Sequence, residues 1–161
     1  MKTAIVYATS HGTTEKVASI IASKLGNVTL INLKNNGHID LTQYQQVIIG
    51  GSIHAGGIQR KVKEFCQRNM VQLLQMRVGL FICAMNEPEF DNELKMAFPE
   101  LISNHAISKK VVGGEFIIEK MNFIEKFLVK KISGVSQTIS KIDESKIADL
   151  VNEMNLNHSN N

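Results

Sequence analysis

The chain has 161 residues, of which 43% are hydrophobic and 20% charged, and its formal net charge at pH 7 is +3. This composition is typical of one globular domain with a real core and excludes a disordered or fibrous chain. No apolar run approaches the roughly 20 residues that cross a bilayer, and the mild positive charge indicates no nucleic-acid partner.

Strand-like apolar runs alternate with segments of helical spacing along the chain. The predicted strands are residues 2–8, 27–33, 46–51, 78–84 and 110–118. The predicted helices are residues 13–25, 58–74, 91–102 and 144–154, with Pro99 expected to bend or end the third. This alternation predicts a parallel sheet with helices on both faces, in a single domain over residues 1–155 with a flexible tail at 156–161.

One segment, residues 119–142, is too long for a plain connection between the fifth strand and the last helix. An apolar set recurs in it at helical spacing, with lysines mainly on the other face, and Ser133 and Gly134 end the predicted helix. The apolar residues are Phe123, Ile124, Phe127, Leu128 and Ile132, and the lysines are Lys126, Lys130 and Lys131. Three interpretations stay open: a helix on an anionic membrane surface, a pocket wall for a flat, carboxylate-bearing substrate, or an extra helix packed onto the sheet.

The loop after the first strand, residues 9–14, is rich in hydroxyl groups and leads into the first helix. A helix N-terminus offers free N–H groups and a positive dipole end, which suit a phosphate. The loop lacks the Gly-Lys-Ser/Thr ending of a triphosphate P-loop and the Gly-x-Gly-x-x-Gly dinucleotide pattern. Neutral donors without Lys or Arg favour a terminal monoester phosphate, such as that of FMN. The alternative is an ordinary helix cap.

Loops at three strand ends together resemble those of the flavodoxin-like family. Residues 9–14 resemble its Ser/Thr-x-x-Gly-x-Thr phosphate loop, and residues 50–57 and 83–87 stand where the family places its two loops beside the flavin ring. The resemblance implies a flavodoxin-like doubly wound, five-stranded parallel sheet of order 2-1-3-4-5, with an extra helical insertion after the fifth strand. The implied FMN-binding residues are Thr9, Ser10, His11, Gly12, Thr13, Thr14, Gly51, Ser52, Ile53, His54, Ala55, Gly56, Ala84, Met85, Asn86 and Glu87.

The chain has no Trp, and its two tyrosines lie away from the ring loops, so ring contacts are expected from Ile53, His54, Met85 and the backbone. Within the family, the chain resembles the branch of menaquinone-dependent protoporphyrinogen IX dehydrogenases. The shared features are a Gly-x-Ser-Ile-x-x-Gly stretch at residues 50–56, the later Glu64-Phe65, and a basic, apolar insertion. The branch is rich in Arg and Tyr before its insertion helix, whereas this chain has Phe-Ile-Ile-Glu-Lys there.

This resemblance implies an FMN-dependent oxidoreductase that passes electrons from a reduced small molecule, such as a porphyrinogen, to a quinone-type acceptor or a redox partner. His54 is the candidate catalytic residue, because imidazole titrates near neutrality; a solvent-exposed loop histidine is the alternative. The candidates for substrate or membrane contact are Phe123, Phe127, Lys126, Lys130 and Lys131. Two other functions stay open: a flavodoxin-type electron carrier without its own substrate, and a flavin-free binding module.

The two cysteines, Cys66 and Cys83, stand in apolar segments, so we expect buried free thiols and a reducing compartment. The first residues lack the layout of a signal peptide. We therefore expect a cytoplasmic protein, with the 119–142 segment as the candidate for peripheral contact with the inner face of the membrane. No spacing of His, Cys, Asp or Glu predicts a metal site.

Overall fold

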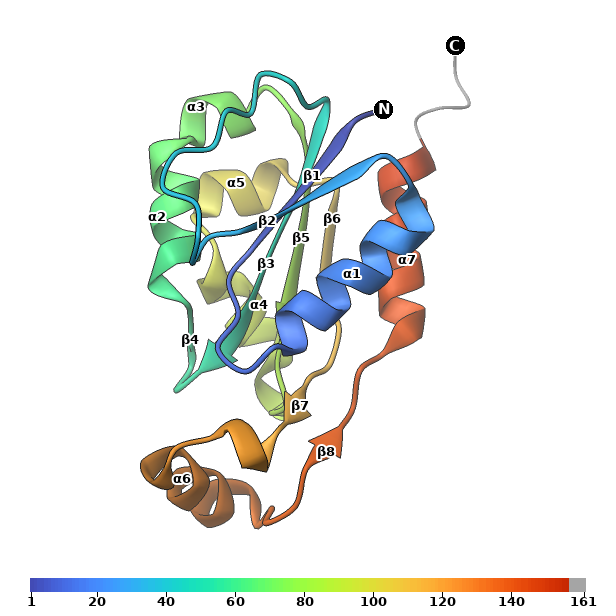
Figure 1. The fold of residues 1–161 in the computed structure, drawn as a ribbon. Coiled ribbons are helices and arrows are strands. Elements are labelled where there is room, and N and C mark those ends of the chain that lie inside the picture. The colour runs from blue at the N-terminus through green and yellow to red at the C-terminus, as the bar shows by residue number, and fades with distance from the viewer. Residues whose placement is uncertain (157–161) are drawn as a thin grey trace.

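A five-stranded parallel sheet forms the centre of the computed structural model, which describes residues 1–156 (Figure 1). Its strands stand in the order β2 (Val28–Asn32), β1 (Thr3–Tyr7), β3 (Gln46–His54), β5 (Arg77–Cys83) and β6 (Ser108–Val111). Counting only these parallel strands along the chain, this is the order 2-1-3-4-5, so the predicted doubly wound sheet is confirmed. Of the predicted tail, Leu156 caps the last helix and residues 157–161 lie outside the described residues.

The apolar residues of the strands point alternately to the two faces of the sheet, and each face is covered by helices (Figure 1). In β1, Ala4 and Val6 pack into one core cluster, while Ile5 and Tyr7 pack into the other. The first face is covered by α2 (Arg60–Arg68), α3 (Met70–Leu73), α4 (Phe90–Ala97) and α5 (Glu100–His105). The second face is covered by α1 (Thr13–Leu25) and α7 (Glu144–Asn155).

The prediction of one helix over residues 58–74 is wrong at its start. Strand β3 continues to His54, turns at Ala55 and Gly56, and returns as the short antiparallel strand β4 (Gly57–Ile58). Both turn residues have positive φ, 48° and 76°, which is the backbone of a two-residue hairpin turn. The helix therefore begins only at Arg60, and it breaks at Asn69 between α2 and α3.

Two other predicted elements are interrupted. Pro99 ends the helix expected over residues 91–102 and leaves α4 and α5, as the proline suggested. The strand expected over residues 110–118 stops at Val111, because Gly113 adopts φ 70° and packs its Cα against the Lys141 carbonyl. Beyond this kink the chain leaves the sheet.

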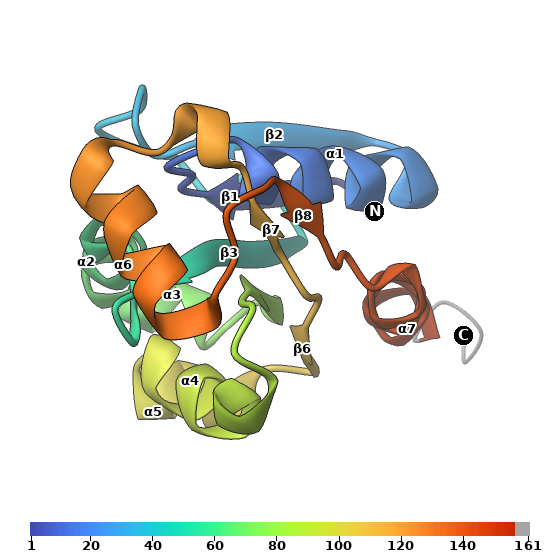
Figure 2. The ribbon, with the colours of Figure 1, turned by 90° about the horizontal axis from the view of Figure 1, so that it is seen from below.

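Residues 115–140, here called the insertion, extend beyond the carboxyl ends of the strands (Figures 1 and 2). The insertion consists of β7 (Glu115–Phe116), the 3-10 turn η2 (Ile118–Lys120), α6 (Phe123–Ser133) and β8 (Ile139–Ser140). Strands β7 and β8 pair antiparallel and form the stem from which α6 projects. The predicted helix and its end at Gly134 are confirmed.

Helix α6 has no buried residue, so packing of its apolar face onto the sheet is excluded as an interpretation. Phe123 is 84% exposed, Ile132 81%, Ile124 68%, Phe127 57% and Leu128 47%. Among residues 1–156, no helix has the length and apolar character needed to cross a membrane.

Candidate functional site

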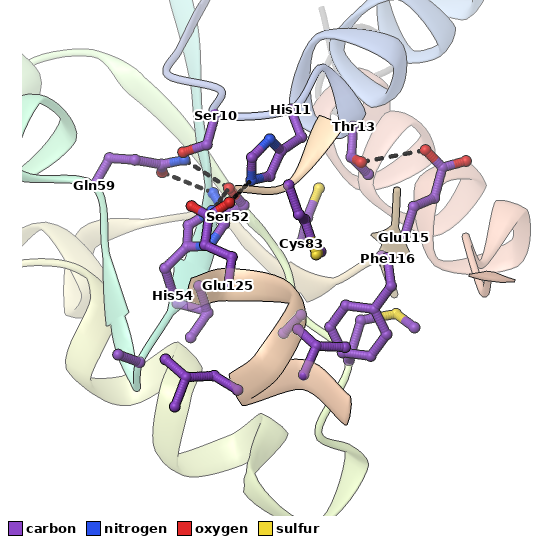
Figure 3. A pocket seen from close by; sticks show the side chains of 18 of the residues that line it. Ser10, His11, Thr13, Ser52, His54, Gln59, Cys83, Glu115, Phe116 and Glu125 are labelled. Carbon is purple, nitrogen blue, oxygen red and sulfur yellow. Dashed lines mark hydrogen bonds and ion pairs between the residues drawn. The ribbon is translucent and has the colours of Figure 1, made fainter. Parts of the chain in front are cut away.

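A cavity of about 610 Å³ opens at the carboxyl ends of the strands, where a doubly wound sheet binds its ligands (Figure 3). Four segments supply its walls: the loop of residues 9–14, here called the hydroxyl loop, the β3–β4 hairpin, the end of β5, and the insertion. The volume lies within the roughly 300–1,000 Å³ of small-molecule and cofactor sites. Segments distant in sequence therefore converge on one ligand-sized space.

The hydroxyl loop presents polar hydrogens at the start of α1. Gly12, at φ 97°, donates its N–H to Thr9 Oγ1 over 2.9 Å, and this bond closes the loop. No hydrogen bond among residues 1–156 uses the N–H groups of Thr13 and Thr14, and the buried Thr14 hydroxyl has no partner within those residues either. Unpaired N–H groups at a helix start are suited to an anion.

A lysine from the insertion completes the surroundings of this loop. Lys120 Nζ donates to the His11 carbonyl oxygen over 3.2 Å, and it lies 3.3 Å from the point where a Cβ on Gly12 would stand. The hydroxyl loop itself has neither Lys nor Arg. The fold supplies a positive charge that the local sequence lacks.

A buried carboxylate ties the insertion to the same helix start. Glu115 Oε1 accepts from Lys16 Nζ over 2.6 Å and from Ser140 Oγ over 2.9 Å. Its Oε2 accepts from Thr13 Oγ1 over 3.2 Å, as Figure 3 shows. The side chain of Glu115 is only 7% exposed. Burial alone would raise its pKa, but the bonds from Lys16, Ser140 and Thr13 outweigh burial and lower it. Glu115 is therefore an ionised anchor between α1 and the insertion.

The other end of the cavity is largely apolar. Ile53, His54 and Ala55 of the hairpin face it, as do Ala84 and Met85 after β5. Phe116 of β7 also lines this space, and it is the aromatic side chain of the cavity apart from the two histidines (Figure 3). A flat aromatic group fits such walls.

Helix α6 closes one side of the cavity. Leu128, Val129 and Ile132 line it, and Glu125 approaches His11, whose Nε2 lies 3.2 Å from Glu125 Oε2. A capping box with Asn122 holds Glu125 in place at the first turn of α6. Leu128 and Ile132 thus border the cavity while staying 47% and 81% exposed, and Phe123 and Phe127 do not line it.

His54 lies in a small polar cluster on the cavity wall. Its Nε2 is 3.0 Å from Ser52 Oγ, and its ring meets that of His11 edge to face at 5.9 Å between centroids. Desolvation by the surrounding loops, and then the nearby His11, lower the pKa of His54, while Glu125 partly opposes them. A neutral imidazole is favoured at this position.

The structure brings most of the predicted cofactor residues together, but not all. The predicted residues that line the cavity are Thr9, Ser10, His11, Thr13, Ser52, Ile53, His54, Ala55, Ala84 and Met85. Those that do not line it are Gly12, Thr14, Gly51, Gly56, Asn86 and Glu87. Gly12 and Thr14 shape the hydroxyl loop from behind, whereas Glu87 lines a neighbouring cavity of about 540 Å³ and lies 3.4 Å from Lys141 Nζ.

The predicted contact residues of α6 lie on its outer side. None of Phe123, Phe127, Lys126, Lys130 and Lys131 lines the cavity. Of the residues of the insertion that line the cavity, sequence reasoning singled out Leu128 and Ile132 by their helical spacing and Glu115 as a group that could orient a ligand, and it missed Phe116, Met121, Glu125 and Val129. A signal for Glu125 was present in the Asn-x-x-Glu spacing from Asn122, which is typical of a helix N-terminus.

Both cysteines are free and buried, as expected. Cys83 lines the cavity from the end of β5, and burial raises its pKa to about 12. A thiol with this pKa stays protonated and unreactive near neutral pH. Cys83 therefore contributes packing to the site and no nucleophile.

A family model described as flavodoxin domain matches residues 4–143. The oxidised flavodoxin 1 of Bacillus cereus is similar with a TM-score of 0.59 and 14% identity, over 98% of this chain and 99% of that one. A mutant flavodoxin of Fusobacterium nucleatum bound to flavin mononucleotide gives 0.53 and 16%, over 98% and 97%. Rubredoxin oxygen:oxidoreductase of Desulfovibrio gigas is similar with a TM-score of 0.53 and 16% identity over 98% of this chain, which spans 37% of that enzyme's length.

No curated protein sequence is significantly similar. The expected flavodoxin-like fold is thus confirmed.

Proposed function

We infer the function from the family: the chain belongs to the flavodoxin-domain family, whose model matches it over residues 4–143. Flavodoxin-domain proteins bind FMN, as the structure of the Fusobacterium flavodoxin illustrates. The chain is accordingly an FMN-binding flavodoxin-domain protein, and this class includes both electron carriers and oxidoreductases.

The residues of the cavity fit FMN at both ends. The unpaired N–H group of Thr13, which lines the cavity, suits the phosphate, and Thr14 and Lys120 lie next to it without lining the cavity. Ile53, Met85 and the other apolar walls suit the isoalloxazine ring, which when bound accepts and releases the electrons. The chain's own residues supply phosphate binding, ring orientation and exclusion of water.

Beyond this, we propose that the chain oxidises a substrate of its own and passes the electrons to a quinone. The observation that carries the proposal is the position of α6, whose Leu128, Val129 and Ile132 extend the apolar wall of the flavin cavity. A simple carrier needs only an exposed ring edge, whereas an added apolar wall provides room for a flat hydrophobic molecule beside the ring. A reduced tetrapyrrole such as a porphyrinogen has this shape.

The outer side of α6 supports the choice of a lipid-soluble acceptor. Phe123 and Phe127 are more than half exposed, and three lysines lie on the same helix. An apolar ridge flanked by lysines suits an anionic membrane surface, where quinones reside.

The alternative is a flavodoxin-type electron carrier that docks on partner proteins. Family and fold are equally consistent with it. The two functions differ in what the insertion must do, because a carrier keeps its electron transfer without α6. The insertion is therefore the place to test them.

The test compares the FMN-loaded chain with a variant in which residues 117–138 are replaced by Asn-Gly. Because Phe116 pairs with Ile139 in the antiparallel stem, a two-residue turn can join the strands. We expect the full chain to oxidise protoporphyrinogen with menaquinone as acceptor. FMN is added in excess to offset the loss of Lys120, so the variant should still carry flavin but lose this turnover by about tenfold or more.

Exchange with an artificial one-electron acceptor is the matched control, and it should stay the same in both proteins. Absence of porphyrinogen oxidation by the FMN-loaded full chain would exclude this substrate. Equal electron transfer in both proteins to every acceptor tried would favour the carrier.

A further inference from the structure

Three side chains form a hydrogen-bonded relay on the hairpin wall of the cavity (Figure 3). Gln59 Oε1 accepts from the Ser52 backbone N–H over 2.8 Å, and Gln59 Nε2 donates to Ser52 Oγ over 2.6 Å. Ser52 Oγ in turn lies 3.0 Å from His54 Nε2. Gln59 has no role in the FMN contacts described above, yet both its Oε1 and its Nε2 form hydrogen bonds here.

The hairpin is built to bring this glutamine to Ser52. The turn at Ala55 and Gly56 folds the chain back, so that Gln59 stands beside a residue seven positions earlier. A Cβ on Gly51 would lie 2.7 Å from Gln59 Oε1. Glycine at position 51 therefore leaves the space that the amide fills.

The direction of each bond follows from the donors available. The Ser52 N–H can only donate, so it fixes which end of the Gln59 amide is the oxygen. The amide nitrogen must then donate to Ser52 Oγ, which leaves the Ser52 hydroxyl proton unused. The acceptor next to that proton among residues 1–156 is His54 Nε2. Nε2 then carries no proton, and the hydrogen of the neutral ring sits on Nδ1.

We propose that Gln59 is a positioning residue that acts through Ser52 to hold His54 as the neutral tautomer protonated on Nδ1. Nδ1 has no hydrogen-bond partner among residues 1–156, so its N–H is available to a carbonyl or anionic group bound beside it. That use of the N–H depends on the proposed FMN and substrate site, but the relay itself does not. The cavity thereby has a neutral donor in place of a cation.

The two neighbours of His54, His11 and Glu125, act on its charge in opposite directions. His11 faces it from the hydroxyl loop, and Glu125 of α6 pairs with His11 at 3.2 Å. His11 disfavours a positive charge on His54, and Glu125 only partly opposes this effect. The lowered pKa of His54 agrees with this geometry.

The sharpest variant is Gln59→Glu, which keeps the shape and reverses one bond. A carboxylate still accepts from the Ser52 N–H, but it also accepts the Ser52 hydroxyl proton, so Ser52 Oγ can only accept from His54. The ring must then place its proton on Nε2, and the pKa of His54 should rise because a carboxylate replaces the neutral amide nearby. Gln67→Glu is the matched control, since Gln67 is exposed on α2, the helix that directly follows Gln59.

The measurement is the ¹⁵N NMR spectrum of the histidine rings in the full chain, with His54 assigned by loss of its signals in His54→Asn. Above the pKa, the unmodified chain and Gln67→Glu should show a protonated Nδ1, and Gln59→Glu a protonated Nε2. A protonated Nε2 in the unmodified chain, or identical His54 signals in Gln59→Glu and Gln67→Glu, would overturn the proposal.

The spectra are recorded both without and with added FMN. Without FMN they test the relay alone, so failure to bind FMN cannot be confused with failure of the relay. If FMN binds and the chemical shift of His54 Nδ1 does not change, this N–H is not used in the cavity. The result on the tautomer would still hold.

Discussion

The sheet body and the insertion are held together by different forces. Phe81 of β5 is fully buried between β3 and the helices α1 and α7, whereas Phe127 of α6 is 57% exposed. The body has two apolar clusters, one on each face of the sheet, and α6 has no buried residue at all. The insertion is fixed mainly by polar bonds at its base and by Lys120 and Glu125 near the hydroxyl loop.

This difference separates two tasks within one chain. Burial of apolar surface stabilises the sheet body. The carboxyl ends of its strands form the edge where the cofactor binds, so the body determines the class of cofactor. The insertion adds a wall to the cofactor cavity without adding to the core. A segment with few buried contacts can be changed or removed at little cost to the fold, so it is suited to determine which molecule reacts.

The comparison is tested most strongly by the same substitution in both regions. Phe81→Ala should lower the free energy of unfolding by about 3–5 kcal/mol, since it empties a fully buried site. Phe127→Ala should change it by less than about 0.5 kcal/mol. Denaturant unfolding followed by circular dichroism measures both values. A loss of several kcal/mol from Phe127→Ala would show that α6 is part of the core.

The sequence predicts the body much better than the insertion, for a physical reason. Apolar periodicity identifies strands such as residues 46–51 and 78–84, because burial is repeated along the segment. The β3–β4 hairpin was missed because its turn depends on positive φ at Ala55, which alanine does not signal. The contact between Gln59 and Ser52 can be inferred only once that turn is known.

Sequence reasoning located those walls of the cavity that directly follow a strand. The hydroxyl loop and the ring loops are local patterns, so their positions follow from the strand assignments. The contacts from Glu115 to Thr13 and Lys16, and from Glu125 to His11, join residues about a hundred positions apart, and no local pattern encodes them. The same applies to Lys120 at the hydroxyl loop.

Glu115 joins the two regions, and Glu115→Gln should have the next largest effect. Loss of the ionised acceptor of Lys16, Ser140 and Thr13 should cost about 2 kcal/mol at pH 7. Because the pKa of Glu115 is lower in the folded chain than its ordinary value of 4.5, this stability is present above pH 4.5 and is lost as the pH falls below it.

Unfolding free energies of the unmodified chain and Glu115→Gln, measured between pH 7 and pH 3.5, check this expectation. The difference between the two proteins should shrink toward the acid end of the range. A difference that grows as the pH falls, or that stays constant, contradicts an ionised anchor. Glu100→Gln on the distant α5 supplies the control for loss of one exposed carboxylate.

The smallest effect is expected at the contact between α6 and the hydroxyl loop. Glu125→Gln keeps the capping box, because glutamine can still accept from the Asn122 N–H, and it removes only the charge that faces His11. A partly exposed pair of this kind contributes about 0.5 kcal/mol, so its loss should increase local opening of α6 about twofold. Hydrogen exchange at residues 123–133 should accelerate by that factor, while exchange in β1 and β3 and the free energy of unfolding stay unchanged. Lys131→Gln, on the exposed side of the same helix, should leave both unchanged. Equal acceleration in the sheet strands would mean that α6 and the body open as one unit, against the separation of the two regions.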